Sequence, residues 1–222
     1  MKLDFTPREL GYRFPAEFER QAALWLSWPH KEASWPGKLS LIYDPYAEFI
    51  LRVAAHQTVK INVENGAMHH FAVDRIVNSA YALSINDVDS LLDNIKFYYH
   101  PTNDAWCRDH GPAFLINESE GTKAIVDWGY NAWGDKYPPY DLDDVIPTLI
   151  GQKMNLPVFH PGIVMEGGSV EFNGKGCIMT TTACLLNENR NPRLSKYEVE
   201  QIFIEYYGGD HILWLGDGIV GD

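Results

Sequence analysis

Two hydrophobic patterns alternate along the chain, one with the two-residue period of a strand and one with the spacing of a helix face. In Thr58–Val63, apolar and polar residues alternate, which predicts a strand. Other runs of branched and aromatic residues lie between turn signals and predict strands as well. The segments predicted as strands are residues 17–30, Thr58–Val63, Ile95–Tyr99, Phe114–Ile116, Lys123–Trp128, Cys177–Thr182 and His211–Leu215.

Between these strands, apolar residues spaced by three or four positions predict amphipathic helices. Pro147 either kinks one of these helices or marks its true start. Ser195 is suited to cap the last helix, and Gly208 to stop it. The segments predicted as helices are Pro45–Ala55, Val73–Ala82, Asp141–Met154 and Lys196–Tyr207.

Turn residues join some of the strands directly. Asn117–Gly121 predicts a hairpin turn, and a second turn is expected at Asn173–Gly176. The order strand, helix, strand, with hairpins added, therefore recurs at intervals of several tens of residues. It indicates an α/β fold, either a propeller-like assembly of modules or a doubly wound sheet, and periodicity alone does not choose between them.

Composition bounds the classes of partner. The 222 residues are 45% hydrophobic and 22% charged, as in a globular protein of one or two domains. A formal net charge of -12 argues against nucleic acid or an anionic membrane as partner. The same charge is compatible with a small cationic substrate.

Targeting and redox signals are few. Residues 1–9 carry acidic residues and a proline where a secretory signal needs an apolar run, and no segment has the length of a membrane span. The three cysteines, Cys107, Cys177 and Cys184, are widely spaced and predict neither a disulfide framework nor a metal site. A reducing, cytoplasmic location is expected.

The densest chemistry lies in Asn103–Pro112, which we expect at a strand end and its exit loop. The aromatic face of Trp106 near the carboxylate of Asp109 suits a planar guanidinium, because the ring attracts the cation and the carboxylate can pair with two of its nitrogens. For these residues alone the alternative is that Arg108 pairs with Asp104 or Asp109 and that Trp106 belongs to the core.

Five motifs lie in order along nearly the whole chain: Trp28-Pro29 with Trp35-Pro36, then Asn103–Pro112, Asn131-Ala132-Trp133-Gly134, Glu166-Gly167-Gly168-Ser169 and Leu185–Pro192. Together they closely resemble the agmatine deiminase family, which includes bacterial-type peptidylarginine deiminases and belongs to the guanidine-modifying superfamily. One such motif would be a weak signal, whereas five in sequence are a strong one.

The resemblance implies a five-bladed α/β propeller of ββαβ modules, of which residues 1–222 would be a single incomplete domain of about three modules. It also implies hydrolysis of a guanidine C–N bond through a covalent cysteine intermediate, without a metal or an organic cofactor. By motif, Asp109 would grip the guanidinium nitrogens and Trp106 would form the aromatic wall of the substrate channel. Glu166 would support the substrate and the catalytic histidine.

In the family, the general acid/base histidine, a second guanidinium-binding aspartate and the nucleophilic cysteine follow the segment that ends here at Asp222. The chain alone is therefore expected to lack activity. Cys107 fills the variable position of Trp-x-Arg-Asp beside carboxylates, which disfavour a thiolate, so we do not expect it to be the nucleophile. Cys177 and Cys184 are expected to be buried packing residues.

The histidines are expected to play no catalytic part. His69-His70 suggests a surface loop, and His110 is expected to be a loop residue next to Asp109.

Three functional hypotheses remain. The first is an agmatine deiminase that forms N-carbamoylputrescine and ammonia for polyamine synthesis, with a peptidylarginine deiminase as its alternative. The second is a non-catalytic guanidinium-binding fragment. The third is an unrelated hydrolase that uses Asp104 and Asp109 as an acid/base pair. The sequence does not determine the oligomeric state, and a homo-oligomer is one of the alternatives.

Overall fold

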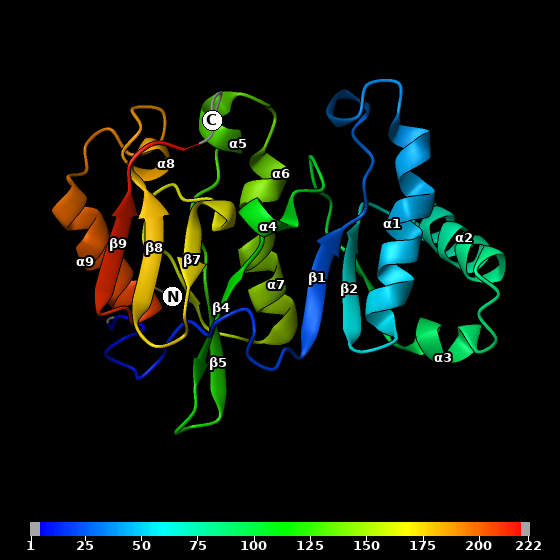
Figure 1. The fold of residues 1–222 in the computed structure, drawn as a ribbon, viewed down its shortest axis with the longest axis horizontal. Coiled ribbons are helices and arrows are strands. Elements are labelled where there is room, and N and C mark those ends of the chain that lie inside the picture. The colour runs from blue at the N-terminus through cyan, green and yellow to red at the C-terminus, as the bar shows by residue number, and fades with distance from the viewer. Residues whose placement is uncertain (1–4, 219–222) are drawn as a thin grey trace. The chain divides into compact units, whose positions relative to one another are not determined.

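A computed structural model describes residues 5–218, in which the chain divides into two compact units. One unit is Gln21–Cys107, and the other combines residues up to Arg20 with those from Arg108 onward. The boundary at Cys107 falls inside the Asn103–Pro112 motif. Figure 1 shows the elements of both units.

The unit Gln21–Cys107 contains three parallel strands, and each is joined to the next by helices because parallel strands need a crossover connection. The sheet order is β1-β2-β3, and buried aliphatic side chains of helices and strands form one core. Its elements are β1 (Ala23–Ser27), the 3-10 turn η1 (Glu32–Ser34), α1 (Leu39–Ala54), β2 (Thr58–Val63), α2 (Gly66–Ala82), α3 (Val88–Asp93) and β3 (Ile95–Tyr99).

Two helices of this unit begin earlier than the hydrophobic pattern predicted. α1 begins at Leu39 and contains Pro45, which we expected to be its first residue. α2 begins at Gly66 because the Asn65 side chain caps it, accepting a hydrogen bond of 3.0 Å from the Met68 N–H. His69 and His70 therefore lie in this helix, and the prediction of a surface loop was wrong.

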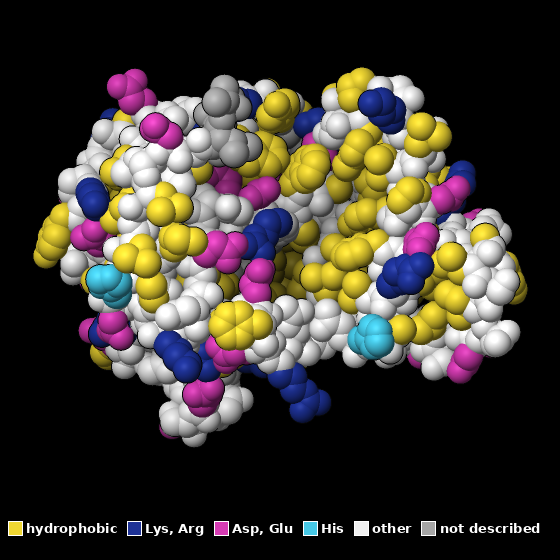
Figure 2. Space-filling view, in the orientation of Figure 1, with side chains coloured by type: hydrophobic (Ala, Val, Ile, Leu, Met, Phe, Trp, Pro, Cys, Tyr) yellow, Lys and Arg dark blue, Asp and Glu magenta, His cyan; other side chains and the backbone are white. Residues whose placement is uncertain are grey.

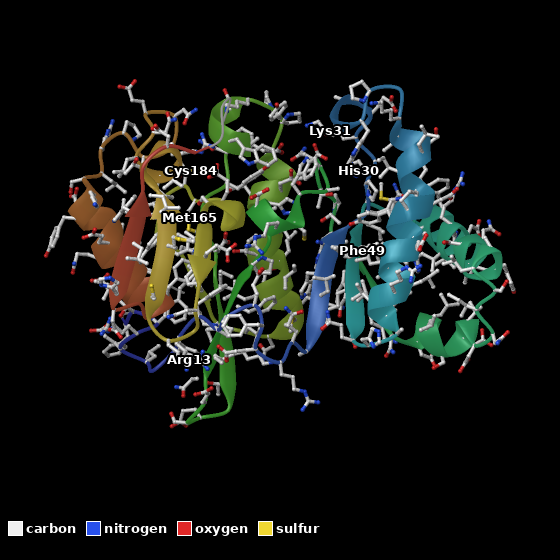
Figure 3. The ribbon with its side chains drawn as sticks, viewed as in Figure 1. Arg13, His30, Lys31, Phe49, Met165 and Cys184 are labelled. Carbon is white, nitrogen blue, oxygen red and sulfur yellow. The ribbon has the colours of Figure 1, made fainter. Side chains whose placement is uncertain are left out.

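The outer surface of α1 keeps some apolar side chains in contact with solvent. Figure 2 shows hydrophobic side chains gathered over this helix, and Phe49, labelled in Figure 3, is 44% exposed. Leu41 is exposed as well, whereas Ile50 and Leu51 on the inner face are fully buried. One face of the helix therefore suffices to anchor it on the sheet.

The other unit repeats one arrangement twice: an antiparallel hairpin, a helical connection, and a strand parallel to the second strand of the hairpin. The predicted ββαβ modules are thus present in sheets β4-β5-β6 and β7-β8-β9, whereas β1-β2-β3 is all parallel. The elements are α4 (Cys107–His110), β4 (Ala113–Asn117), β5 (Thr122–Val126), α5 (Ala132–Asp135), α6 (Asp141–Asp144), α7 (Ile146–Met154), β6 (Val158–Phe159), η2 (Gly167–Ser169), β7 (Val170–Phe172), β8 (Cys177–Thr181), α8 (Thr182–Leu185), α9 (Lys196–Tyr207) and β9 (His211–Leu215).

Local capping accounts for the helix ends of this unit. Pro147 stands in the first turn of α7 and so marks its start, since a first-turn residue needs no intrahelical N–H bond. Ser195 and Glu198 form a capping box at the start of α9, and Gly208 ends this helix in the left-handed conformation, with φ 72°. The predicted cap and stop of α9 are confirmed, and the second alternative for Pro147 holds. The single helix predicted over Asp141–Met154 is divided into α6 and α7.

The segment before Arg20 joins the two modules. Arg13 exchanges two backbone hydrogen bonds of 2.9 Å with Ile116, and the Phe14 N–H donates to the Tyr207 carbonyl at 2.9 Å. The guanidinium of Arg13, labelled in Figure 3, also bonds Glu19 at 2.9 Å. A single hydrophobic core runs through both modules beneath this segment.

The architecture is therefore mixed α/β, as predicted. Among residues 5–218 it consists of three separate three-stranded sheets, and no sheet closes on itself.

Candidate active site

Trp106 lies in the loop that follows β3 and is 38% exposed. Its ring stacks on that of Trp35, with centroids 5.5 Å apart and an angle of 25° between the planes. The Trp35-Pro36 and Asn103–Pro112 motifs are thus in contact within one unit. Trp106 is therefore not a core residue.

Asp104 has a structural environment. It is 4% exposed, accepts a short hydrogen bond from the Ser34 hydroxyl, and lies 3.8 Å from the Lys31 ammonium. His30 and Lys31, labelled in Figure 3, follow β1, so they bring the segment after β1 to the loop after β3. A buried and paired carboxylate is poorly suited to exchange protons with a substrate, which disfavours the acid/base pair of Asp104 and Asp109.

The backbone from Cys107 to His110 forms the helical turn α4, and the prediction of a strand end and exit loop was wrong for these residues. Asp109 is half-buried in this turn, and its Oδ1 accepts a hydrogen bond of 3.0 Å from the Gly168 N–H. Arg108 forms ion pairs with Glu17 and Glu171, rather than the pairing with Asp104 or Asp109 that we considered.

Gly167 and Gly168 allow two motifs to meet. A Cβ on Gly167 would collide with the Arg108 carbonyl oxygen, and one on Gly168 would collide with Asp109 Oδ1. Both glycines are therefore needed because the backbone after Glu166 passes directly over α4. The structure thus brings the segments that carry Asp109 and Glu166 together.

Glu166 follows Met165 in extended backbone, so the two side chains point to opposite sides. Met165, labelled in Figure 3, is buried in the core, where the Tyr207 hydroxyl donates to its sulfur at 3.5 Å. Glu166 is also buried, but in polar surroundings: Arg190 Nε donates to its Oε1 at 2.5 Å.

The Leu185–Pro192 motif is bound to the Glu166 segment. The Asn191 side chain accepts from the Val164 N–H at 2.9 Å and donates to the Val164 carbonyl at 2.8 Å. This two-way bond resembles the pairing of neighbouring strands and fixes Arg190 beside Glu166.

The Asn131–Gly134 motif forms an unusual left-handed turn. Four consecutive residues from Ala132 to Asp135 have φ between 49° and 82°, although only Gly134 among them lacks a Cβ. Such backbone costs about 1–2 kcal/mol per ordinary residue. The Asn131 side chain stabilises the turn by accepting from the Gly134 N–H at 2.9 Å, and its amide donates to the Asn189 carbonyl at 2.9 Å. With Asn103–Pro112, which contacts Gly168 through Asp109, four of the five motifs therefore meet at the segment that carries Glu166.

The cysteines are all half-buried. Cys107 lies 3.7 Å from the Ser27 hydroxyl. Cys177 and Cys184 are less buried than the packing residues we expected, because Cys177 opens β8 and Cys184, labelled in Figure 3, lies in the short helix α8.

His110 is a helical and buried residue rather than a loop residue. Its side chain has no exposed surface and lies 4.0 Å from the buried Asp143 carboxylate. Through residues 5–218, no group of three His, Cys, Asp or Glu side chains could hold a metal ion. Over the same residues, no helix combines the length and apolarity needed to cross a membrane.

The sequence pattern did not single out Arg190. Arg190 lies inside the Leu185–Pro192 motif, but an arginine among polar residues predicts a solvated loop. Its 8% exposure and its contact with Glu166, 24 positions away, appear only in the folded chain.

Comparisons with known proteins bear on this site. A sequence model of the Porphyromonas-type peptidyl-arginine deiminase family matches residues 13–222. A Legionella pneumophila protein with the provisional name agmatine deiminase is 35% identical over 229 residues, covering 100% of this chain and 60% of that protein. The structure of an agmatine deiminase of Enterococcus faecalis catalysing its reaction is 32% identical, with a TM-score of 0.80, over 98% of this chain and 56% of that one.

A cysteine-to-serine variant of C. jejuni agmatine deiminase with substrate bound gives a TM-score of 0.76 at 29% identity, over 94% of this chain and 57% of that one. The chain thus spans less than two thirds of the length of these relatives.

Proposed function

Because the chain belongs to the Porphyromonas-type peptidyl-arginine deiminase family, we propose that the protein hydrolyses the guanidine C–N bond of agmatine to give N-carbamoylputrescine and ammonia. The enzyme class follows from the family and from the agmatine deiminases that the chain resembles. The substrate is the part that an experiment must decide.

One observation carries the proposal: Asp109 and Glu166 lie on segments that touch through Gly167 and Gly168. Two carboxylates held by one piece of backbone suit a guanidinium, whose planar nitrogens pair with carboxylate oxygens and whose charge needs compensation in a desolvated site. Asp109 would grip the guanidinium nitrogens, and Glu166 would support the substrate. Trp106 would form an aromatic wall.

In the proposed reaction, a cysteine thiolate attacks the guanidinium carbon and forms a C–S bond. The C–N bond then breaks, and a histidine delivers the proton with which ammonia leaves. The same histidine then takes a proton from a water molecule, whose oxygen attacks the resulting thiouronium carbon. The C–S bond breaks, the thiolate is released, and the protonated product loses its proton to solvent to give the ureido group. In this proposal that cysteine, the histidine and a second aspartate would lie beyond Asp222, and residues 1–222 would form about three modules of a five-bladed propeller.

The family description favours a second candidate substrate, peptidyl-arginine. Ammonia release from agmatine, free arginine and an arginyl peptide distinguishes the two in one assay of the full-length protein. We expect kcat/KM to be highest for agmatine. Preference for the peptide would replace the substrate assignment, and no release from any of the three would contradict the deiminase proposal itself.

A further inference from the structure

We propose that Arg190 is a positioning residue that fixes the carboxylate of Glu166 for reaction with substrate. The inference rests on the role proposed for Glu166 and adds a residue to which neither the motifs nor the comparisons give a role. Three observations on the described residues carry it.

The first observation is the contact itself. Arg190 Nε lies 2.5 Å from Glu166 Oε1, and each side chain retains only 3% of its exposed surface. Within residues 5–218, no hydrogen bond to the other oxygen, Oε2, is found. One oxygen is thus bound to the chain, which fixes the direction of the second and its ability to accept from a ligand.

The second observation is how Arg190 is itself held. Its Nη1 donates to Asn189 Oδ1 at 2.6 Å, and its backbone N–H donates to the Asn187 carbonyl at 3.0 Å. A Cβ at Gly134 would approach Nη1 to 2.6 Å and collide with the Asn189 side chain. The left-handed turn at Gly134 thus leaves room for the guanidinium, and Asn131 ties that turn to Asn189.

The third observation is the energetic cost of the arrangement. Burying two charges is unfavourable and is compensated only by good geometry, so a buried pair contributes little net stability compared with apolar residues of similar size. The turn from Ala132 to Asp135 adds backbone strain, and strain of this kind gathers at functional sites. Both costs are explained if the arrangement serves to orient Glu166.

The carboxylates of Asp109 and Glu166, which are proposed to bind substrate, are held in a similar way. In each, the chain holds at least one oxygen, Asp109 Oδ1 through the Gly168 N–H and Glu166 Oε1 through Arg190. A carboxylate tied in this way reaches the substrate with its direction already fixed, which lowers the entropy lost on approach to the transition state.

The test uses the full-length enzyme and the variants Arg190→Met, Arg190→Lys and Glu166→Gln. Misplacement of a reacting group by about 1 Å can lower the rate by about 100-fold, so Arg190→Met is expected to reduce kcat by about that factor while KM changes much less. Arg190→Lys keeps the charge and should recover part of the loss. In the Glu166→Gln background, Arg190→Met should have little further effect, because the two residues act together.

Arg13→Met is the matched control, since it removes an arginine–glutamate pair of the same unit at a distance in sequence from Glu166. We expect it to leave kcat unchanged. Full kcat in a folded Arg190→Met variant, or an undiminished loss in the Glu166→Gln background, would overturn the inference.

A second measurement does not depend on activity. In 15N-arginine-labelled protein, the Arg190 Nε–H signal should exchange slowly with solvent and should shift on Glu166→Gln. An unchanged signal would contradict the inference even if Arg190→Met did not fold. If the wild-type enzyme hydrolysed no guanidine while the Arg190 Nε–H signal behaved as expected, only the proposed function would be contradicted.

Discussion

At the scale of single residues, Asp109 combines a charge that suits a guanidinium with a backbone contact that fixes its direction. The Gly168 N–H holds Oδ1 at 3.0 Å, and the half-buried position reduces screening by water. An Asp109→Asn substitution keeps the shape and removes the charge. We expect kcat/KM for agmatine to fall about a thousandfold, equivalent to about 4 kcal/mol, with the fold retained.

Steady-state kinetics and circular dichroism of the full-length enzyme would check this prediction. Asp74→Asn, at an exposed position of α2, is a control that removes the same charge and should keep activity. Near-normal turnover in a folded Asp109→Asn variant would show that Asp109 is structural.

At the scale of elements, α9 is the helix whose start is best defined. The Ser195 hydroxyl accepts from the Glu198 N–H, and the Ser195 N–H donates to the Glu198 carboxylate; these are the two bonds of the capping box. Ser195→Ala is therefore expected to lower the free energy of unfolding by about 1 kcal/mol. Urea unfolding measures it, and Ser90→Ala, at an exposed position of α3, is expected to change little. Equal losses in the two variants would argue against the cap.

Elements with a strong local signal were predicted with their observed bounds: Thr58–Val63, Ile95–Tyr99, Lys196–Tyr207 and His211–Leu215. Elements that depend on the rest of the fold were not. β6 has two residues and no sequence signal of its own, and it is a strand because it pairs with β5. Likewise, the residues of α4 were expected in the loop that leaves a strand. The alternation of apolar and polar residues carries no information about a helical turn that distant contacts stabilise.

In the candidate site, too, some residues could be predicted from the sequence and others could not. Trp106, Asp109 and Glu166 were recognised by motif, and their catalytic roles remain predictions. Arg190 was not predicted, because its contact with Glu166 forms only when the chain folds. Gly167, after Glu166, leaves room for the backbone of Arg108, and this contact between distant segments likewise appears only in the folded chain.

At the scale of the whole molecule, the ion pair between Arg13 and Glu19 makes stability depend on pH. The hydrogen bonds from Arg13 and from the Ala16 N–H lower the pKa of Glu19 to about 2. A lowered carboxyl pKa stabilises the fold above the unfolded value of about 4.3, and this stabilisation is lost as pH falls towards 2. With a third of the Glu19 side chain exposed, we expect about 1 kcal/mol after screening.

Urea unfolding of the wild type and of Glu19→Gln should therefore differ at about pH 7 and converge near pH 2. A gap that stays constant over this range would contradict the assignment.

Catalytic activity is also a property of the whole molecule. The 222-residue chain holds Trp106, Asp109 and Glu166, whereas the proposed mechanism expects the nucleophile and the general acid/base outside these residues. We expect the isolated chain to form no ureido product from agmatine, because loss of a nucleophile removes nearly all covalent catalysis. A colorimetric ureido assay measures this. Steady turnover that disappears in Cys107→Ser would instead identify Cys107 as the nucleophile.

The segment before Arg20 has a consequence for the order of events during synthesis. It is synthesised before the two modules that it joins, yet the Phe14 N–H pairs with the carbonyl of Tyr207, which is made 193 residues later. At roughly 5–20 residues per second, this segment waits about 10–40 s for its partner. The unit Gln21–Cys107 is continuous in sequence and has no such delay. The nascent chain can thus fold the unit Gln21–Cys107 before the segment that precedes it, and this earlier segment is among the last to form its native contacts.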